Sequence, residues 1–164
     1  MNSSLAKRCS KIKLVITDVD GVLTDGGMYY TNKGDIMKRF FARDGMGVTL
    51  LKKKKILTLI ITKEKTEMVR QWAKRMKIEK MYEGIIQKEL ILDNICKKFK
   101  VKPDEISYIG DDVNDIELLK KVGLAAVPND AINEAKKNCQ YKCKAVGGHG
   151  AFRELADLIL LEKS

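Results

Sequence analysis

Short, uniformly apolar runs alternate along this chain with longer stretches of mixed character. The runs are residues 13–17, 56–61, 106–110 and 124–128. Their length and continuity predict buried strands. The intervening stretches repeat apolar residues at helical spacing, and they cover residues 64–77, 88–100 and 114–123. Strands that alternate with helices predict an α/β fold, a Rossmann-like parallel sheet with helices on both faces.

One segment breaks this alternation. Residues 26–41 (GGMYYTNKGDIMKRFF) carry β-forming stretches on either side of TNKGD, whose asparagine and glycine favour a turn. We therefore expect a β-hairpin inserted between the first strand and the first helix. An isolated hairpin is marginally stable in water, so this one should pack on another subunit and act as an oligomerisation element. The length of 164 residues otherwise predicts a single domain spanning 1–164.

The composition limits the kinds of partner and substrate that we expect the protein to bind. The net charge is +10, but the lysines are spread over the whole chain and the few aromatic residues are not interleaved with them, which argues against a nucleic-acid interface. The charge instead suits an anionic small-molecule substrate. No apolar run approaches the length of a membrane span and the N-terminal residues lack the apolar core of a signal peptide, so we expect a cytoplasmic protein without membrane contact. The four scattered cysteines are expected to be free thiols.

Carboxylates gather where the predicted strands end. Asp18 and Asp20 follow the first strand, and Asp111 and Asp112 follow the third. The carboxyl ends of parallel strands meet at one edge of a sheet, where ligands usually bind. Clustered carboxylates are costly without a cation, and an all-oxygen site suits Mg²⁺. Gly21 allows a tight turn that can present backbone N–H groups to an anion.

These residues resemble the motifs of the haloacid dehalogenase superfamily. DVDGVLTD, with Asp18 and Asp20, is similar to the first motif in its phosphatase form. Thr62 ends the second strand, Lys88 begins a helix, and GDDVND (residues 110–115) follows the third strand, in the order of the remaining motifs. Four ordered motifs over nearly the whole chain are far more specific than the aspartate pair alone.

The resemblance implies phosphomonoester hydrolysis through a phosphoaspartyl intermediate. Asp18 would attack phosphorus, and Asp20 would protonate the leaving alcohol and later activate water. Thr62 and Lys88 would bind the transferring phosphoryl group. Positioning and charge neutralisation are the main requirements of phosphoryl transfer.

The same resemblance implies a magnesium site. Asp18, the backbone carbonyl of Asp20, and Asp111 would hold Mg²⁺. Asp112 and Asp115 would orient Lys88 or the waters of the metal rather than bind it directly.

Within the superfamily, a short chain with a hairpin in place of a cap domain resembles the subgroup that dephosphorylates 3-deoxy-ulosonic acid phosphates. Residues 43–47 (RDGMG) and 147–154 (GGHGAFRE) are similar to further signatures of that subgroup. Its members are typically homotetramers whose hairpins form a central barrel. Arg43 and Arg153 are candidates for contacts to a substrate carboxylate or to a neighbouring subunit, and structural ion pairs explain them equally well.

The sequence leaves two alternatives for the sugar-phosphate substrate. Residues 62–67 read TKEKTE, and Glu64 favours a nonulosonate 9-phosphate, whose hydroxyls it could bind. The RDG and GGHGA segments favour an octulosonate 8-phosphate. Lys63 stands where both types usually carry glycine.

Two other classes of function compete with the enzyme hypothesis. A receiver domain would need a single phosphoacceptor aspartate with its own threonine and lysine partners, which the chain does not offer. A catalytically weak assembly module, related to the phosphatase-like domain of acylneuraminate cytidylyltransferases, would be free to lose motif aspartates. This chain keeps all of them, which favours an enzyme.

Overall fold

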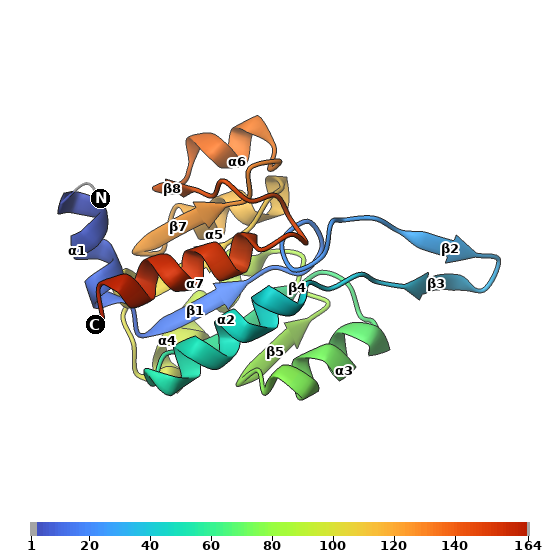
Figure 1. Cartoon of the computed structure of the whole chain (residues 1–164), viewed down its shortest axis with the longest axis horizontal. Coiled ribbons are helices and arrows are strands. Elements are labelled where there is room, and N and C mark those ends of the chain that lie inside the picture. The colour runs from blue at the N-terminus through green and yellow to red at the C-terminus, as the bar shows by residue number, and fades with distance from the viewer. Residues whose placement is uncertain (1–2, 164) are drawn as a thin grey trace.

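A six-stranded parallel sheet forms the centre of the computed structural model, which describes residues 3–163 (Figure 1). The strand order is β5-β4-β1-β6-β7-β8. The strand bounds are β1 Leu14–Thr17, β4 Leu57–Thr62, β5 Lys80–Glu83, β6 Ile106–Ile109, β7 Leu124–Val127 and β8 Tyr141–Lys142. The four predicted strands are confirmed, and they occupy the four central positions. The prediction omits β5 and β8, the two edge strands.

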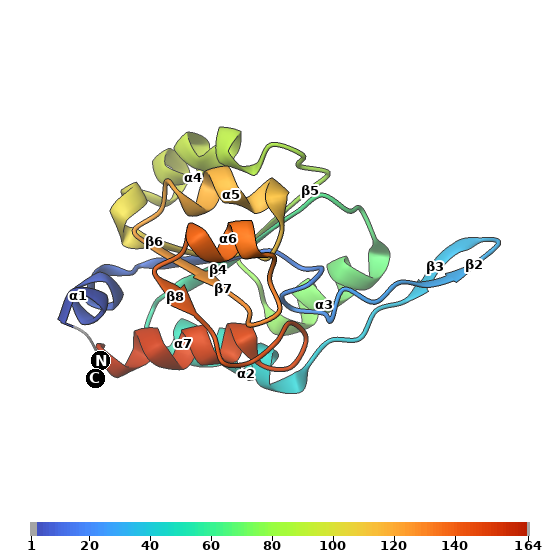
Figure 2. The ribbon, with the colours of Figure 1, turned by 90° about the horizontal axis from the view of Figure 1, so that it is seen from above.

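Helices cover both faces of this sheet, as predicted (Figure 2). One face carries α1 Ser3–Lys11, α2 Ala42–Lys53, α3 Glu67–Met76 and α7 Ala151–Leu161, and the other carries α4 Leu92–Phe99, α5 Ile116–Leu119 and α6 Asn133–Lys137. Short 3-10 turns are η1 Lys88–Ile91, η2 Pro103–Glu105 and η3 Val113–Asp115. Within residues 3–163, none of the helices combines the length and the apolar character that crossing a membrane requires.

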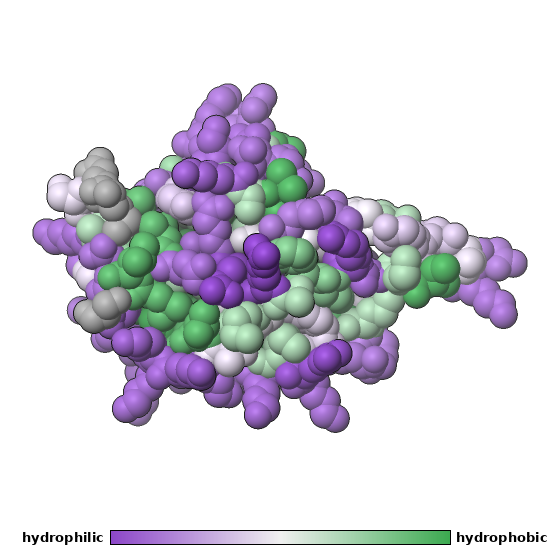
Figure 3. Space-filling model, viewed as in Figure 1, coloured by the Kyte–Doolittle hydropathy of each residue, from purple (hydrophilic) through white to green (hydrophobic). Residues whose placement is uncertain are grey.

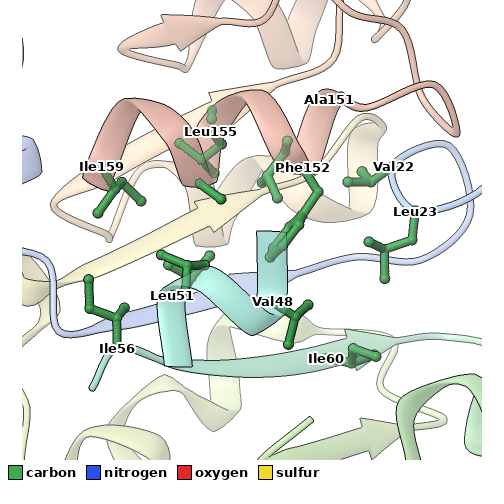
Figure 4. Packing of buried hydrophobic residues seen from close by; sticks show 14 of the residues in the cluster. Val22, Leu23, Val48, Leu51, Ile56, Ile60, Ala151, Phe152, Leu155 and Ile159 are labelled. Carbon is green, nitrogen blue, oxygen red and sulfur yellow. The ribbon is translucent and has the colours of Figure 1, made fainter. Parts of the chain in front are cut away.

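The two cores follow from the alternation of side chains along each strand. In β1, Val15 points into the core beneath α2 and α7, whereas Leu14 and Ile16 point into the core beneath α4 and α5. Both faces of β1 are buried, which explains its continuous apolar run. Figure 4 shows Phe152 of α7 reaching toward Val48 of α2 in the first of these cores.

The predicted hairpin is present and projects from the sheet (Figure 1). Its strands, β2 Tyr29–Thr31 and β3 Gly34–Met37, pair with each other in antiparallel fashion and form a separate two-stranded sheet. Apolar side chains lie exposed along it, namely Met28, Tyr29, Tyr30, Ile36 and Met37. Figure 3 shows a green, hydrophobic patch on the projecting hairpin, and a larger hydrophobic area at the opposite end of the same face.

Candidate active site

The carboxyl ends of β1, β4 and β6 bring the predicted residues together. The three strands are neighbours in the sheet, so Asp18 after β1, Thr62 at the end of β4 and Asp111 beyond β6 line one cleft of about 360 Å³. Asp20 and Glu64 line the same cleft, together with Lys63. The structure thus gathers, in one place, residues that the sequence separates by more than ninety positions.

Lys88 lies beneath this cleft and is completely buried. Its Nζ is 2.8 Å from Asp18 Oδ1 and 2.6 Å from Asp115 Oδ1. Burial alone would lower the pKa of this lysine, but the two carboxylates outweigh it and the pKa is raised. The ammonium group is therefore a fixed positive charge beside the Asp18 carboxylate.

Asp115 binds Lys88 beneath the cleft. Its Oδ1 accepts hydrogen bonds from Lys88 Nζ and from the Tyr108 hydroxyl at 2.6 Å, and its Oδ2 accepts from the backbone N–H groups of Asp111, at 2.8 Å, and Asp112, at 3.1 Å. Both oxygens are thus occupied. Tyr108 is missing from the predicted site because its hydroxyl is hidden within an apolar strand run.

The electrostatics at the end of the sheet call for a cation. Burial, chiefly, raises the pKa of Asp18 to about 7, although Lys88 opposes the shift. Burial and the neighbouring Asp18 raise the pKa of Asp111 to about 8. Asp111 Oδ1 is buried and, among the described residues, has no hydrogen-bond partner. Two buried carboxylates that repel each other are the usual setting of a divalent cation.

The oxygen ligands available fit Mg²⁺ well. Carboxylate oxygens of Asp18, Asp111 and Asp115 lie within 4.8 Å of one another. Because Asp115 already uses both oxygens, Asp18 and Asp111 are the better ligands, and the backbone carbonyl of Asp20 is a further oxygen on the same loop. Asp112 accepts from the N–H of Val113 at 2.7 Å and so shapes the turn that carries Asp111.

Asp20 is held from one side. Thr24 Oγ1 donates to Asp20 Oδ1 at 3.3 Å, and Lys38 Nζ lies 2.7 Å from the same oxygen. Among residues 3–163, both donors bind Oδ1, which leaves Oδ2 free to exchange a proton. Lys38 could not be predicted from the sequence, because its contact with Asp20 depends on how the hairpin folds back.

Gly21 shows why this loop needs glycine. Its φ is +85°, and a Cβ there would overlap the Asp111 carboxylate. The loop is supported from behind by Gly147 and Gly148, which leave no room for a side chain against the backbone of Gly21 and Thr24. Gly148 N–H also donates to the carbonyl of Val22 at 2.9 Å. The glycine-rich segment 147–150 therefore supports the loop that follows β1.

The two signature segments, residues 43–47 and 147–154, contact each other outside the cleft. Asp44 is fully buried, and its Oδ1 accepts from the N–H of Arg153 at 2.8 Å, which caps α7. Arg153 Nε pairs with Asp157 Oδ1 at 2.7 Å, and the Arg43 guanidinium lies over the Phe41 ring. Within one chain, neither arginine lines the cleft. A substrate contact by Arg43 or Arg153 remains a prediction that would involve a neighbouring subunit.

Comparison with known proteins gives a consistent result. A model of the haloacid dehalogenase-like hydrolases matches residues 48–155. The 3-deoxy-D-manno-octulosonate 8-phosphate phosphatase of Escherichia coli K12 is 34% identical over 161 residues, which cover 98% of this chain and 86% of that protein.

Solved structures agree with this chain closely. The 3-deoxy-D-manno-octulosonate 8-phosphate phosphatase of Yersinia pestis has a TM-score of 0.95 at 34% identity, with 98% of this chain and 87% of that chain covered. The corresponding enzyme of Moraxella catarrhalis, in complex with a magnesium ion, a phosphate ion and KDO, has a TM-score of 0.95 at 31% identity, with 99% and 93% covered. The resemblance predicted from the sequence motifs is confirmed, and the chain belongs to the haloacid dehalogenase-like hydrolase family as an enzyme of the phosphatase type.

Proposed function

We propose that this enzyme hydrolyses the phosphate ester of a 3-deoxy-ulosonic acid, with 3-deoxy-D-manno-octulosonate 8-phosphate as the preferred substrate. The observation that carries the proposal is the convergence of Asp18, Asp20, Lys88 and Asp111 at one sheet edge. The octulosonate is favoured because relatives that match over almost the whole chain are named for it. Glu64, which lines the cleft, is the feature that favours a nonulosonate 9-phosphate instead.

In this proposal, the residues divide the chemistry between them. Asp18 attacks phosphorus and forms a phosphoaspartate, while Asp20 gives its proton to the departing alcohol oxygen. Asp20 then removes a proton from water, which attacks the phosphoaspartate and releases inorganic phosphate. Lys88 and Thr62 hold the phosphoryl oxygens, and Lys88 neutralises negative charge as it develops. A bound Mg²⁺ would supply further neutralisation of the phosphoryl charge.

A panel of phosphate esters tests the substrate. We expect phosphate release in Mg²⁺ buffer to show a kcat/KM for octulosonate 8-phosphate at least about tenfold above those for nonulosonate 9-phosphates and unrelated sugar phosphates. A higher value for a nonulosonate 9-phosphate would overturn the octulosonate preference and agree with the alternative that Glu64 favours. Inertness toward every ester, with the protein folded, would contradict the proposal and favour the assembly module.

Magnesium binding is expected to stabilise the fold more at pH 8 than at pH 6. Protons compete with the cation for Asp18 and Asp111, because the pKa values of both are raised, to about 7 and 8. At a hundredfold excess over Kd, binding adds about 2.7 kcal/mol, or roughly 5–10 °C in Tm, measured by differential scanning fluorimetry at pH 8.

The matched variants are Asp111→Asn, which should lose most of this shift, and Asp93→Asn on the exposed face of α4, which should keep it. An equal shift at both pH values, or a full shift in Asp111→Asn, would place the cation elsewhere.

We also propose that the protein is a homotetramer assembled through its hairpins. The support is the row of exposed apolar side chains on β2 and β3, of which Met28 and Tyr30 are each 62% exposed. Apolar residues gathered on a projecting element mark a protein interface.

A further inference from the structure

The hairpin reaches the active site through Lys38. This lysine follows β3, yet its side chain is only 3% exposed, because it lies between two carboxylates. Its Nζ is 2.7 Å from Asp20 Oδ1 and 3.4 Å from Asp35 Oδ2. Asp35 and Lys38 both line the cleft that contains Asp18. The hairpin therefore contributes two charged side chains to the cleft, in addition to its apolar outer surface.

One carboxylate oxygen of Asp35 has no hydrogen-bond donor among the described residues. Its Oδ1 is buried and, among the residues that the structure describes, receives no hydrogen bond. Leaving a buried carboxylate oxygen without a donor is costly, and such atoms are uncommon in folded proteins. Among residues 3–163, Asp111 Oδ1 is the other buried carboxylate oxygen of this cleft without a hydrogen-bond partner, and a cation held with Asp18 would account for it. No such explanation applies to Asp35, which lies outside that carboxylate cluster.

We infer that Asp35 and Lys38 form a subsite for the leaving alcohol, in which Asp35 Oδ1 accepts a hydrogen bond from a substrate hydroxyl and Lys38 positions Asp20. This inference rests on the proposed function. Asp35 is joined to Asp20 through the single ammonium group of Lys38, so it lies near the alcohol oxygen that Asp20 protonates. An ulosonic acid phosphate carries hydroxyl groups on the carbons beside that ester. Its carboxylate would be repelled by Asp35 and must bind elsewhere.

Lys38 is a positioning residue in this arrangement. Its ammonium group donates a hydrogen bond to Asp20 and forms an ion pair with Asp35. By holding Asp20 Oδ1, together with Thr24, it keeps Oδ2 available for proton transfer. The need for that proton depends on the leaving group, because p-nitrophenolate departs without protonation and an alkoxide does not.

Three substrates separate these roles: octulosonate 8-phosphate, n-butyl phosphate, which has no hydroxyl groups, and p-nitrophenyl phosphate. Asp35→Ala, which removes the acceptor, is expected to lower the ratio of kcat/KM for the octulosonate over n-butyl phosphate about tenfold, mainly through KM. Lys38→Gln is expected to lower kcat for both alkyl esters by about 10–100-fold and for p-nitrophenyl phosphate far less. Lys38→Arg should restore most of the loss.

Lys33→Gln is the matched control, because Lys33 lies exposed in the turn of the same hairpin. Equal losses on the octulosonate and n-butyl phosphate in Asp35→Ala would show that Asp35 binds no substrate hydroxyl. Equal losses on all three substrates in Lys38→Gln would make Lys38 purely structural. If the wild type releases phosphate from none of them in Mg²⁺ buffer, the proposed function itself fails and this inference fails with it.

Discussion

Asp18→Asn is expected to reduce phosphate release by at least about 10⁴-fold, because asparagine keeps the shape of the side chain and removes the nucleophile. Asp18 is 6% exposed and lies 2.8 Å from Lys88 Nζ, so its carboxylate is held in place where it lines the cleft. The measurement is a phosphate-release assay with the best substrate of the panel. Circular dichroism and Tm of the variant separate lost chemistry from lost structure.

The control for this variant is Asp93→Asn, the same chemical change on an exposed helical position. It should retain full turnover. A folded Asp18→Asn protein that kept more than about a tenth of the wild-type kcat would exclude Asp18 as the nucleophile.

Lys88→Met is expected to lower the free energy of unfolding by about 3–5 kcal/mol at pH 8 in metal-free buffer, because it leaves two buried carboxylates without their cation. Those carboxylates, on Asp18 and Asp115, lie 2.8 and 2.6 Å from Lys88 Nζ. Methionine has nearly the length of lysine, so the loss reports charge rather than a cavity. Urea denaturation measures it.

The loss of stability in Lys88→Met should itself depend on pH. The pKa of Asp18 is already raised to about 7, and removal of Lys88 raises it further. A carboxyl group whose pKa is higher in the folded than in the unfolded state binds protons on folding, so stability falls as pH rises between the two values. The deficit of Lys88→Met should therefore be smaller at pH 6 than at pH 8.

The exposed pair of Lys120 and Glu117 supplies the comparison. Lys120→Met should change the free energy of unfolding by no more than about 0.5 kcal/mol. A deficit below about 1 kcal/mol in Lys88→Met at pH 8 would mean that the two buried carboxylates are neutralised by something other than Lys88.

Much of the site could be predicted from the sequence, because it depends on strand ends. The strands β1, β4 and β6 are buried on both faces, so each appears as a continuous apolar run that stops at a polar residue. Parallel pairing then brings Asp18, Thr62 and Asp111 to one edge without further information. The edge strands escaped prediction because β5 is half-exposed and β8 has only two residues.

Contacts that depend on tertiary structure could not be predicted in this way. Lys38 contacts Asp20 because the hairpin brings it back to the loop that follows β1, and no local sequence pattern predicts that contact. In the subgroup signatures, the sequence draws attention to Arg43 and Arg153. The structure shows a fixed role for their neighbours instead, since Asp44 caps α7 and Glu154 binds the backbone N–H groups of Lys144 and Ala145.

The hairpin is structurally separate from the six-stranded sheet. In the part of the chain that the structure describes, strands β2 and β3 pair only with each other, and an isolated bridge between Thr24 and Phe40 closes the base of the insertion. We therefore expect that replacing residues 28–37 would leave the register of the six-stranded sheet unchanged. In the arrangement that we propose, a change confined to these residues would alter the subsite for the leaving alcohol and the surface for assembly, and it would leave the proposed nucleophile in place.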